Sequence, residues 1–446
     1  MRQVLGFLVA WLLSTSASGA EWRVGIARTE ITPKDLIWMA GYASRNHPAE
    51  GVLHPLWAKA LALDDAQGHR AVIVTADLIG FNRALCERVV ERVKPATGLE
   101  RAQVMFNASH THSGPVIRVA HRITYPLDAT HERAVHAYAR TLEDKLVALV
   151  EKACASLRPA QLAFGEGKAT FAMNRRTKRA QGYVIAPNPA GPVDHTVPVL
   201  RVADEQGRLL AVLFGYACHN TTTSIYQFNG DYAGFAQIAL EKAHPDATAL
   251  FMIGCGGDSN PEPRGTIELA EAHGKALAEA VDRVLAGPMV PLAGPLGVAF
   301  DRVDLPFVDP PSKEELEKQL QSKDVYRQRL AAHLLDQLKQ QGSLPASYAA
   351  PVHVIHFGGQ LVLIGLPGET VVDYALRLRK QLPGQRLWIA GYTNEVFAYL
   401  PSERVLAEGG YEGGGAMVYS GIHGPFKPGV EDRIIGLAQR LATATP

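Results

Sequence analysis

Residues 103–115 read QVMFNASHTHSGP, a short apolar run that leads directly into two histidines, His110 and His112. Side chains two residues apart in an extended segment project to the same side, so both imidazoles can serve one site. In α/β sheets the ligand crevice lies outside the carboxyl ends of the strands. The stretch therefore predicts an α/β fold with a functional site at this strand end.

Four other strand-like runs also end in polar residues. The run LLAVLFGYAC leads into His219, ALFMIGCGG into Asp258, LVLIGLPG into Glu369, and RLWIAGYT into Asn394 and then Tyr399. Helix-like stretches separate the strand-like ones, and this alternation predicts layered β-sheets flanked by helices. Polar groups at so many strand ends suggest one shared site.

Hydrophobic periodicity gives the expected bounds of these elements. Strands are expected at 69–78, 103–108, 197–202, 209–218, 247–255, 353–366 (with a turn at Gly358-Gly359) and 386–393. Helices are expected at 83–93, 131–157, 234–243, 267–285 and 370–382.

Residues 312–341 differ from the rest of the chain. They are rich in Glu, Lys, Gln and Leu, and Pro310-Pro311 precedes them. This composition predicts one or two exposed amphipathic helices that connect two parts of the fold. A coiled-coil partner helix is the alternative, although the heptads are not sustained.

The first 20 residues have the layout of a secretory signal peptide. Arg2 provides a positive start, VLGFLVAWLL at 4–13 is a short apolar core, and Ser18-Gly19-Ala20 offers small residues for cleavage before Glu21. A membrane anchor is the alternative, but spanning a bilayer takes about 20 apolar residues. No later segment is long and apolar enough to cross a membrane. We therefore expect a mature domain at 21–446, exported to the periplasm or secreted.

The charges of the chain are balanced. It carries 45 basic and 44 acidic residues, and loss of Arg2 with the signal would leave 44 of each. A neutral surface gives no electrostatic footprint for nucleic acid or for an anionic membrane. A lipid substrate would therefore be recognised by apolar contact rather than by charge.

The four cysteines are Cys86, Cys154, Cys218 and Cys255, and no two are closely spaced. Their scatter excludes a zinc ribbon and a disulfide scaffold. If one pair bridges in an oxidising compartment, Cys218 and Cys255 are the best candidates, because both precede polar motifs expected to converge.

The histidine pair alone fits several kinds of site. The metallo-β-lactamase pattern continues with Asp and His, whereas Ser113-Gly114-Pro115 follows here. Barrel amidohydrolases place His-x-His on their first strand, whereas a strand–helix–strand unit precedes this pair. A histidine such as His219 is by itself more often a core or rim histidine than a ligand, and Glu369 by itself is an acid in a first helical turn.

Taken together, the motifs resemble the neutral (alkaline) ceramidase family, over essentially the whole mature chain. The matching segments, in order, are VGIARTEIT at 24–32, MAGY at 39–42, TADL at 75–78, NASHTHSGP at 107–115, Asn174-Arg175, LPGE at 366–369, Thr393-Asn394 with Tyr399, and YEG at 411–413. The histidine motif is fairly specific, and the ordered set is stronger than any single member.

The resemblance implies a zinc ion bound by His110, His219, Glu369 and Tyr399. Two imidazoles and one carboxylate are a recognised catalytic zinc set, and the tyrosine is the less usual member. His112 is then the expected general base toward water and acid toward the leaving amine.

The same resemblance implies that Arg175 and Tyr411 donate hydrogen bonds to a tetrahedral oxyanion. The family's Gly-Asp-Val-Ser-Pro-Asn segment is altered here to Gly-Asp-Ser-Asn-Pro at 257–261, so a role for Ser259 as nucleophile is disfavoured. The sequence ends at Pro446, soon after the tyrosine segment, and we expect the N-terminal catalytic domain without the family's C-terminal domain.

The sequence thus predicts a single large α/β domain that hydrolyses an N-acyl amide, with ceramide or a related lipid as the favoured substrate. One alternative is a zinc hydrolase of a small amide, ester or lactone. The other is a non-catalytic exported binding protein, which the presence of every expected ligand and of His112 argues against.

Overall fold

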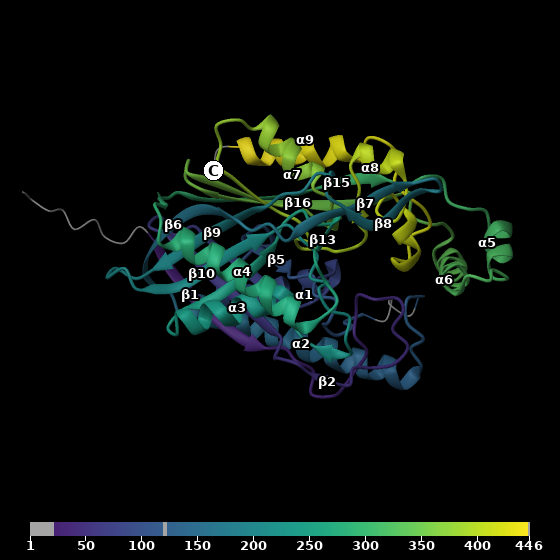
Figure 1. The fold of residues 1–446 in the computed structure, drawn as a ribbon, viewed down its shortest axis with the longest axis horizontal. Helices are drawn as coiled ribbons and strands as arrows, with labels where there is room; N and C mark the ends of the chain where they lie inside the picture. Colours follow the sequence, from purple (N-terminus) through teal and green to yellow (C-terminus); the bar gives the residue numbers. More distant parts are fainter. Residues whose placement is uncertain (1–21, 119–122, 445–446) are drawn as a thin grey trace, which may run out of the picture.

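The computed structural model describes residues 22–118 and 123–444, whose two largest β-sheets stack face to face with helices outside both (Figure 1). The layers run helix, sheet, sheet, helix. The α/β class with layered sheets is therefore confirmed. The proposed signal peptide at 1–20 lies outside the described residues.

The larger sheet contains nine of the described strands. Its order is β12-β10-β9-β6-β1-β3-β4-β5, with β14 pairing on β6. The strands are β1 (Trp22–Glu30), β3 (Trp57–Asp65), β4 (Arg70–Ala76), β5 (Val104–Ala108), β6 (Arg158–Lys168), β9 (Thr196–Ala203), β10 (Leu209–Tyr216), β12 (Thr248–Ile253) and β14 (Val290–Leu292). Its outer face is covered by α1 (Arg83–Thr97), α2 (Ala129–Ala155), α3 (Asp231–Ala243) and α4 (Ile267–Leu285).

The smaller sheet has the order β15-β16-β17-β19. Its strands are β15 (Leu296–Pro306), β16 (Ser347–Phe357), β17 (Leu361–Gly365) and β19 (Leu387–Ala390). Helices α7 (Asp373–Gln381) and α9 (Val430–Thr443) cover its outer face, and α8 (Glu403–Glu408) lies at their end (Figure 1).

Both sheets are buried on both faces, which explains the nearly continuous apolar strands in the sequence. In β4 the side chain of Ile73 packs into the core between the sheets, whereas Val72 and Val74 pack under the helices. The inter-sheet core also holds Leu213 of the larger sheet and Trp388 of the smaller.

Three crossover units set the position of the site. The pairs β4–β5, β10–β12 and β17–β19 are parallel, and a helix connects each. Asn107 at the end of β5 joins the other two pairs, because its Oδ1 accepts from Ile253 N–H at 3.0 Å and its Nδ2 donates to Gly391 O at 2.8 Å. The carboxyl ends of strands from both sheets therefore meet.

The strands and helices expected around the site are found close to their predicted bounds, except for the start of one helix. The helix expected from residue 370 begins at Asp373, and Glu369 lies instead in the two-residue strand β18 (Glu369–Thr370). Elements that the sequence reading did not identify include β3, β6, β15 and α9, together with the hairpin of β7 (Ala172–Arg179) and β8 (Gly182–Asn188).

The helices predicted within 312–341 are confirmed as two, α5 (Lys313–Gln319) and α6 (Val325–Gln341). A capping box of Ser312 and Glu315 starts α5, and Gly342, with a φ of 76°, ends α6. The pair projects from the body of the molecule (Figure 1), and its buried leucines form a small cluster that also includes Ile123 and Leu344 from outside the pair.

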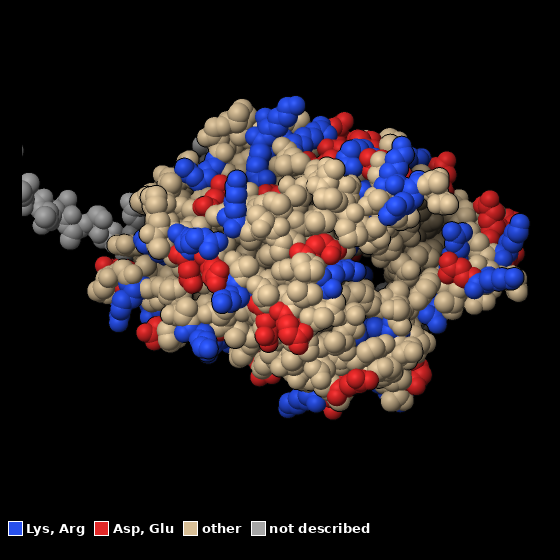
Figure 2. Space-filling model, in the orientation of Figure 1, with Lys and Arg blue, Asp and Glu red and all other residues tan. Residues whose placement is uncertain are grey.

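Among the described residues, none of the helices combines the length and the apolarity needed to cross a bilayer. Basic and acidic side chains are interspersed on the face shown in Figure 2. This mixture is what the balanced charge count leads one to expect.

Candidate metal centre

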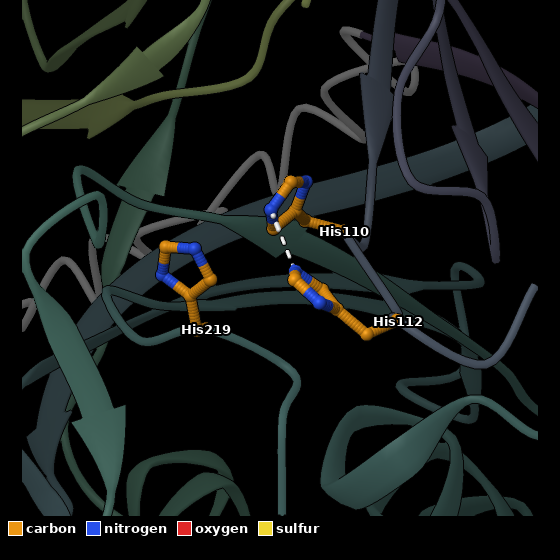
Figure 3. A group of neighbouring side chains, drawn as sticks. All are labelled: His110, His112 and His219. Carbon is orange, nitrogen blue, oxygen red and sulfur yellow. Dashed lines mark hydrogen bonds between the residues drawn. The ribbon is translucent and has the colours of Figure 1, made fainter. Parts of the chain in front are cut away.

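The histidine pair follows β5 at a sharp change of backbone direction. His110 has a φ of 60°, a left-handed conformation that is costly for a side chain with a Cβ. The next residue, Thr111, forms a parallel bridge with Asn220, and His112 N–H donates to Asn220 O at 3.2 Å. The turn places the rings of His110 and His112 with centroids 4.9 Å apart, beside His219 (Figure 3).

Backbone carbonyls fix the tautomers of two of these histidines. His110 Nδ1 lies 2.6 Å from Ile79 O, and His219 Nδ1 lies 2.8 Å from Gly256 O. A carbonyl oxygen only accepts, so each Nδ1 carries the proton and each Nε2 presents a bare lone pair.

Those lone pairs point toward other atoms that can bind a metal ion. Glu369 Oε2 lies 3.3 Å from His110 Nε2 and 3.2 Å from His219 Nε2. Tyr399 OH lies 3.2 Å from His219 Nε2, and His112 Nε2 lies 3.2 Å from His110 Nε2. Ligands about 2.0 Å from a tetrahedral ion are about 3.3 Å from one another. The donor set therefore fits a cation.

Possible ligand atoms of His110, His112 and His219 all lie within 4.8 Å of one another, so this group could hold a metal ion. The carboxylate and phenol reach it because Glu369 and Tyr399 are direct neighbours in the parallel pair of β18 with β20 (Tyr399–Leu400). Gly368 makes this turn possible, since its φ is 66° and a Cβ there would lie 2.7 Å from Ala398 O.

A family model for "Neutral/alkaline non-lysosomal ceramidase, N-terminal" matches residues 22–268, more than half of the chain. The chain belongs to this ceramidase family. The sequence resemblance is therefore confirmed, and the match includes the histidine motif and His219.

Individual members of the ceramidase family are related to the chain at low identity. The neutral ceramidase of Pseudomonas aeruginosa is 28% identical over 245 residues, which cover 52% of this chain and 36% of that protein. Neutral ceramidase A of Dictyostelium discoideum is 25% identical over 291 residues, 58% of this chain and 39% of that protein. The neutral ceramidase of Mycobacterium tuberculosis is 23% identical over 462 residues, 85% and 71% respectively.

The fold is shared with a solved ceramidase. The crystal structure of the neutral ceramidase from Pseudomonas aeruginosa superposes with a TM-score of 0.72 and 21% identity, covering 96% of this chain and 76% of that one. The chain spans only about a third of the curated Pseudomonas protein in the sequence match. The layered architecture extends beyond the region that sequence similarity covers.

In this ceramidase-family chain, Arg175 lies behind the tyrosine rather than on the cavity wall. Its Nη2 donates to Tyr399 OH at 2.7 Å, its Nε to Glu412 at 2.8 Å and its Nη1 to Asn260 at 3.1 Å. Arg176 donates to the other oxygen of Glu412 at 2.6 Å. Three directions of the Arg175 guanidinium are thus occupied by buried partners.

Tyr411 does reach the cavity of the metal centre. The cavity is lined by His110, His112, Glu369, Tyr399 and Tyr411. The rings of Tyr399 and Tyr411 meet edge to face, with centroids 5.4 Å apart. Two of the expected site residues, His219 and Arg175, do not line this cavity. Both contact Tyr399.

Burial favours the neutral form of His112 and His219. Burial, together with Arg175, lowers the pKa of His219 to about 4. Burial and the neighbouring rings of His110 and His219 hold the pKa of His112 well below its ordinary value. Neutral imidazole is the form that binds a metal ion or accepts a proton.

Ser259 and the cysteines lie away from the cavity lining. Ser259 is fully buried in β13 (Ser259–Pro261), and its hydroxyl has no hydrogen-bond partner. Cys218 and Cys255 are buried free thiols, as Cys86 also is, and the bridge considered for the first two is not formed. The polar segment that follows β12 is therefore structural in this geometry. Its Asp258 accepts from Val372 N–H at 2.9 Å and Asn174 Nδ2 at 3.0 Å.

Sequence reasoning missed the residues that support His112. Arg45, which is 3% exposed, donates to His112 O at 3.0 Å and to Ile225 O at 3.1 Å. The Tyr42 ring packs 4.9 Å from the His112 ring, and a Cβ on Gly41 would lie 2.5 Å from His112 Cβ. The sequence did contain a signal for Gly41 and Tyr42, because the segment MAGY at 39–42 matches the family.

Proposed function

We propose that this chain is an exported zinc hydrolase that cleaves the N-acyl amide bond of ceramide or a related N-acyl lipid. One observation carries the proposal: two bare imidazole nitrogens and a carboxylate converge at a cavity in a chain of the ceramidase family. Export is proposed from the signal-like residues 1–20.

The donor set favours zinc. His110, His219 and Glu369 supply the two imidazoles and one carboxylate of many catalytic zinc sites, and Tyr399 would be a fourth ligand. When bound, zinc supplies Lewis-acid chemistry, lowering the pKa of water and polarising a carbonyl. Arg175 supports Tyr399 in this role, because a donated hydrogen bond favours the phenolate.

His112 is the proposed general base. It lines the cavity, and burial disfavours the charged ring, so the neutral ring can accept a proton. It would take a proton from the attacking water and give it to the leaving amine. Tyr411 is the proposed hydrogen-bond donor to the oxyanion, an effect of about 2 to 4 kcal/mol. We propose that Arg175 acts through Tyr399.

The first experiment measures hydrolysis of a fluorescent N-acyl sphingosine by the purified protein, with and without chelator, alongside its zinc content. Release of fatty acid that chelator abolishes and zinc restores would support the proposal. Zinc-loaded protein that releases none would refute the lipid substrate and direct the search to small amides, esters and lactones.

Three variants separate the roles. We expect His110→Ala to lose both zinc and activity, because it removes a ligand. We expect His112→Ala to keep zinc and lose about 10²- to 10⁴-fold in kcat, the usual contribution of a general base. Ser259→Ala is the control and should stay within about twofold, since its hydroxyl is buried away from the cavity lining. Full activity of His112→Ala would refute the assigned base, and loss in Ser259→Ala would revive a serine mechanism.

A further inference from the structure

The segment that carries Tyr411 is rich in glycine. Residues 409–415 read GGYEGGG, so Tyr411 and Glu412 are its two residues with side chains. Glycine has more backbone freedom than any other residue, and such a segment is not stiff by itself. Backbone hydrogen bonds such as that from Ala416 N–H to Tyr411 O, 2.9 Å long, join residues close in the chain. Besides the Tyr411 ring, Glu412 is therefore the side chain that can tie this segment to the rest of the molecule.

Glu412 binds the neighbouring strand β7 with both of its carboxylate oxygens. One oxygen accepts from Arg175 Nε at 2.8 Å, and the other accepts from Arg176 Nη1 at 2.6 Å. The Glu412 side chain is 2% exposed, and both arginine side chains are buried. Hydrogen bonds between charged groups are the strong ones, and the interior shields these from water. The carboxylate is thus held from two directions.

The guanidinium that Glu412 holds contacts both tyrosines of the centre. Besides its hydrogen bond to Tyr399 OH, the Arg175 guanidinium lies 5.7 Å from the centre of the Tyr399 ring and 6.0 Å from that of Tyr411. In the part of the chain that the structure describes, the ion pair of Arg175 is with Glu412. Burial alone would raise the pKa of the Glu412 carboxyl, but the guanidiniums of Arg175 and Arg176 outweigh burial and lower it. One charged carboxylate therefore supports the groups around both tyrosines.

We infer that Glu412 is a positioning residue of the metal centre, which orients Arg175 toward the Tyr399 phenol and fixes Tyr411 at the cavity wall. The inference rests on the proposed zinc hydrolase and adds to it a residue outside the described cavity lining. Glutamine in place of Glu412 has one oxygen for two guanidiniums, and its NH₂ end would face a donor. One arginine then loses its partner, and the two tyrosines lose their fixed positions.

Zinc affinity tests the contact with Arg175 without any substrate. Metal-free protein is titrated with zinc in competition with a chromogenic chelator, and the dissociation constants are compared. We expect Glu412→Gln to bind zinc about tenfold more weakly than wild type, as is usual when a group that supports a metal ligand is removed. Glu412→Asp keeps the charge on a shorter side chain and should lie between the two. If Glu412→Gln does not fold, Glu412→Asp serves in every comparison.

Glu395→Gln is the matched control. Glu395 is also buried and also bridges two arginines, Arg83 at 3.1 Å and Arg302 at 2.6 Å, but it does not line the described cavity. Removing its charge leaves two arginines underpaired in the same way. The control should therefore lose stability as Glu412→Gln does and bind zinc as wild type does. A loss of zinc affinity as large as that of Glu412→Gln would overturn the inference.

A double-mutant cycle separates positioning from a general loss of stability. Because Glu412 acts on zinc through the Tyr399 phenol, Tyr399→Phe removes the group on which its effect depends. Adding Glu412→Gln to Tyr399→Phe should then change the zinc dissociation constant by less than about twofold. A further loss equal to that in the wild-type background would contradict the assigned route. In the hydrolysis assay at saturating zinc, Glu412→Gln should lower kcat about tenfold with little change in KM, because Tyr411 acts in the transition state.

Hydrogen exchange of the metal-free protein tests the anchor without zinc or substrate. Glu412→Gln should speed exchange within 409–416 at least about tenfold, and Glu395→Gln should leave it unchanged. If exchange and zinc affinity respond as expected and no amide is cleaved, the positioning role stands and the hydrolase proposal falls. If ceramide is cleaved and Glu412→Gln keeps wild-type exchange, zinc affinity and kcat, the hydrolase stands and the positioning role falls. A protein that binds no zinc refutes the proposed function, and exchange within 409–416 then decides the anchor.

Discussion

Strained residues gather around the candidate metal centre. His110, Tyr392 and Asn394 have φ values of 60°, 51° and 64°, and the ring of His110 lies 4.4 Å from that of Tyr392. Such conformations cost about 1 to 3 kcal/mol each and persist only where other contacts hold them. Here Asn394 N–H donates to Phe106 O at 2.7 Å and Tyr392 N–H to Gly368 O at 3.0 Å. The backbone hydrogen bonds between strand ends therefore preorganise the site.

Arg45 gives the sharpest test of this preorganisation. It holds the carbonyls of His112 and Ile225 together, and its guanidinium stacks on the Tyr42 ring at 5.3 Å. Lysine keeps the positive charge but cannot donate hydrogen bonds in the planar, two-pronged geometry of a guanidinium. We expect Arg45→Lys to lower kcat about tenfold through misplacement of His112, with KM and zinc content unchanged.

Arg101→Lys is the control for that variant. Arg101 also donates to a carbonyl, Val104 O at 2.7 Å, and also stacks on an aromatic ring, that of Phe300. It should leave kcat unchanged. If Arg45→Lys and wild type have equal kcat, the guanidinium of Arg45 does not position His112. If the variant loses zinc, Arg45 supports the metal ligands instead.

At the level of residues, the sequence identified site residues that directly follow strands. It missed residues in loops that contact other loops. His110, His219 and Glu369 each follow an apolar run, so strand-end logic finds them. Arg45 lies in an irregular segment. Its role depends on which loops meet, and periodicity carries no information about that.

At the level of elements, helices of similar sequence character are held to the molecule very differently. Leu437 of α9 is buried in the large core over the smaller sheet. Leu334 of α6 is equally buried, but in a small cluster that also includes Ile123 and Leu344. Sub-global opening occurs first in units with few shared contacts.

The same substitution in the two helices should therefore have different consequences. Leu437→Ala should lower the free energy of global unfolding by about 2 to 5 kcal/mol, as cavity-forming core changes do. Leu334→Ala should instead speed hydrogen exchange within 313–341 while the urea midpoint of the body stays close to wild type. Mass-spectrometric hydrogen exchange and urea unfolding measure both, and an equal fall in midpoint would show that the insertion unfolds with the body.

The elements missed by sequence reasoning share a physical reason. Strands β6 and β15 are partly exposed and mix polar with apolar residues, so neither a buried run nor strict alternation marks them. Helix α9 did carry a signal, since Val430, Ile434, Leu437 and Ala438 share one face. Which sheet each strand joins follows from tertiary packing, which the pattern of one strand does not encode.

At the scale of the whole molecule, His353 makes stability depend on pH. It lies on β16 and is fully buried, with Nε2 2.8 Å from Ala102 O and Nδ1 3.3 Å from Asn394 Nδ2. The neutral ring can donate to the carbonyl and accept from the amide. Burial, together with Arg101, lowers the pKa of His353 to about 3.

The sign follows from proton linkage. An unfolded histidine has a pKa of about 6.5, so between pH 6.5 and 3 the unfolded chain binds more protons than the folded one. The contribution of His353 is therefore fully present above pH 6.5 and is lost as the pH falls toward 3. Below pH 6 this amounts to about 1.4 kcal/mol per pH unit.

His353→Gln removes the titration while a neutral amide can still donate to Ala102 O. Urea unfolding at pH 8, 7, 6 and 5, with chelator present to exclude metal binding, gives the free energy of unfolding of both proteins. We expect the wild type to lose about 1 to 2 kcal/mol more than the variant between pH 7 and 5. The contact between β16 and the 3-10 helix at Arg101–Gln103 is then strongest at neutral pH. Parallel pH profiles for the two proteins would show that His353 is not kept neutral by the folded interior.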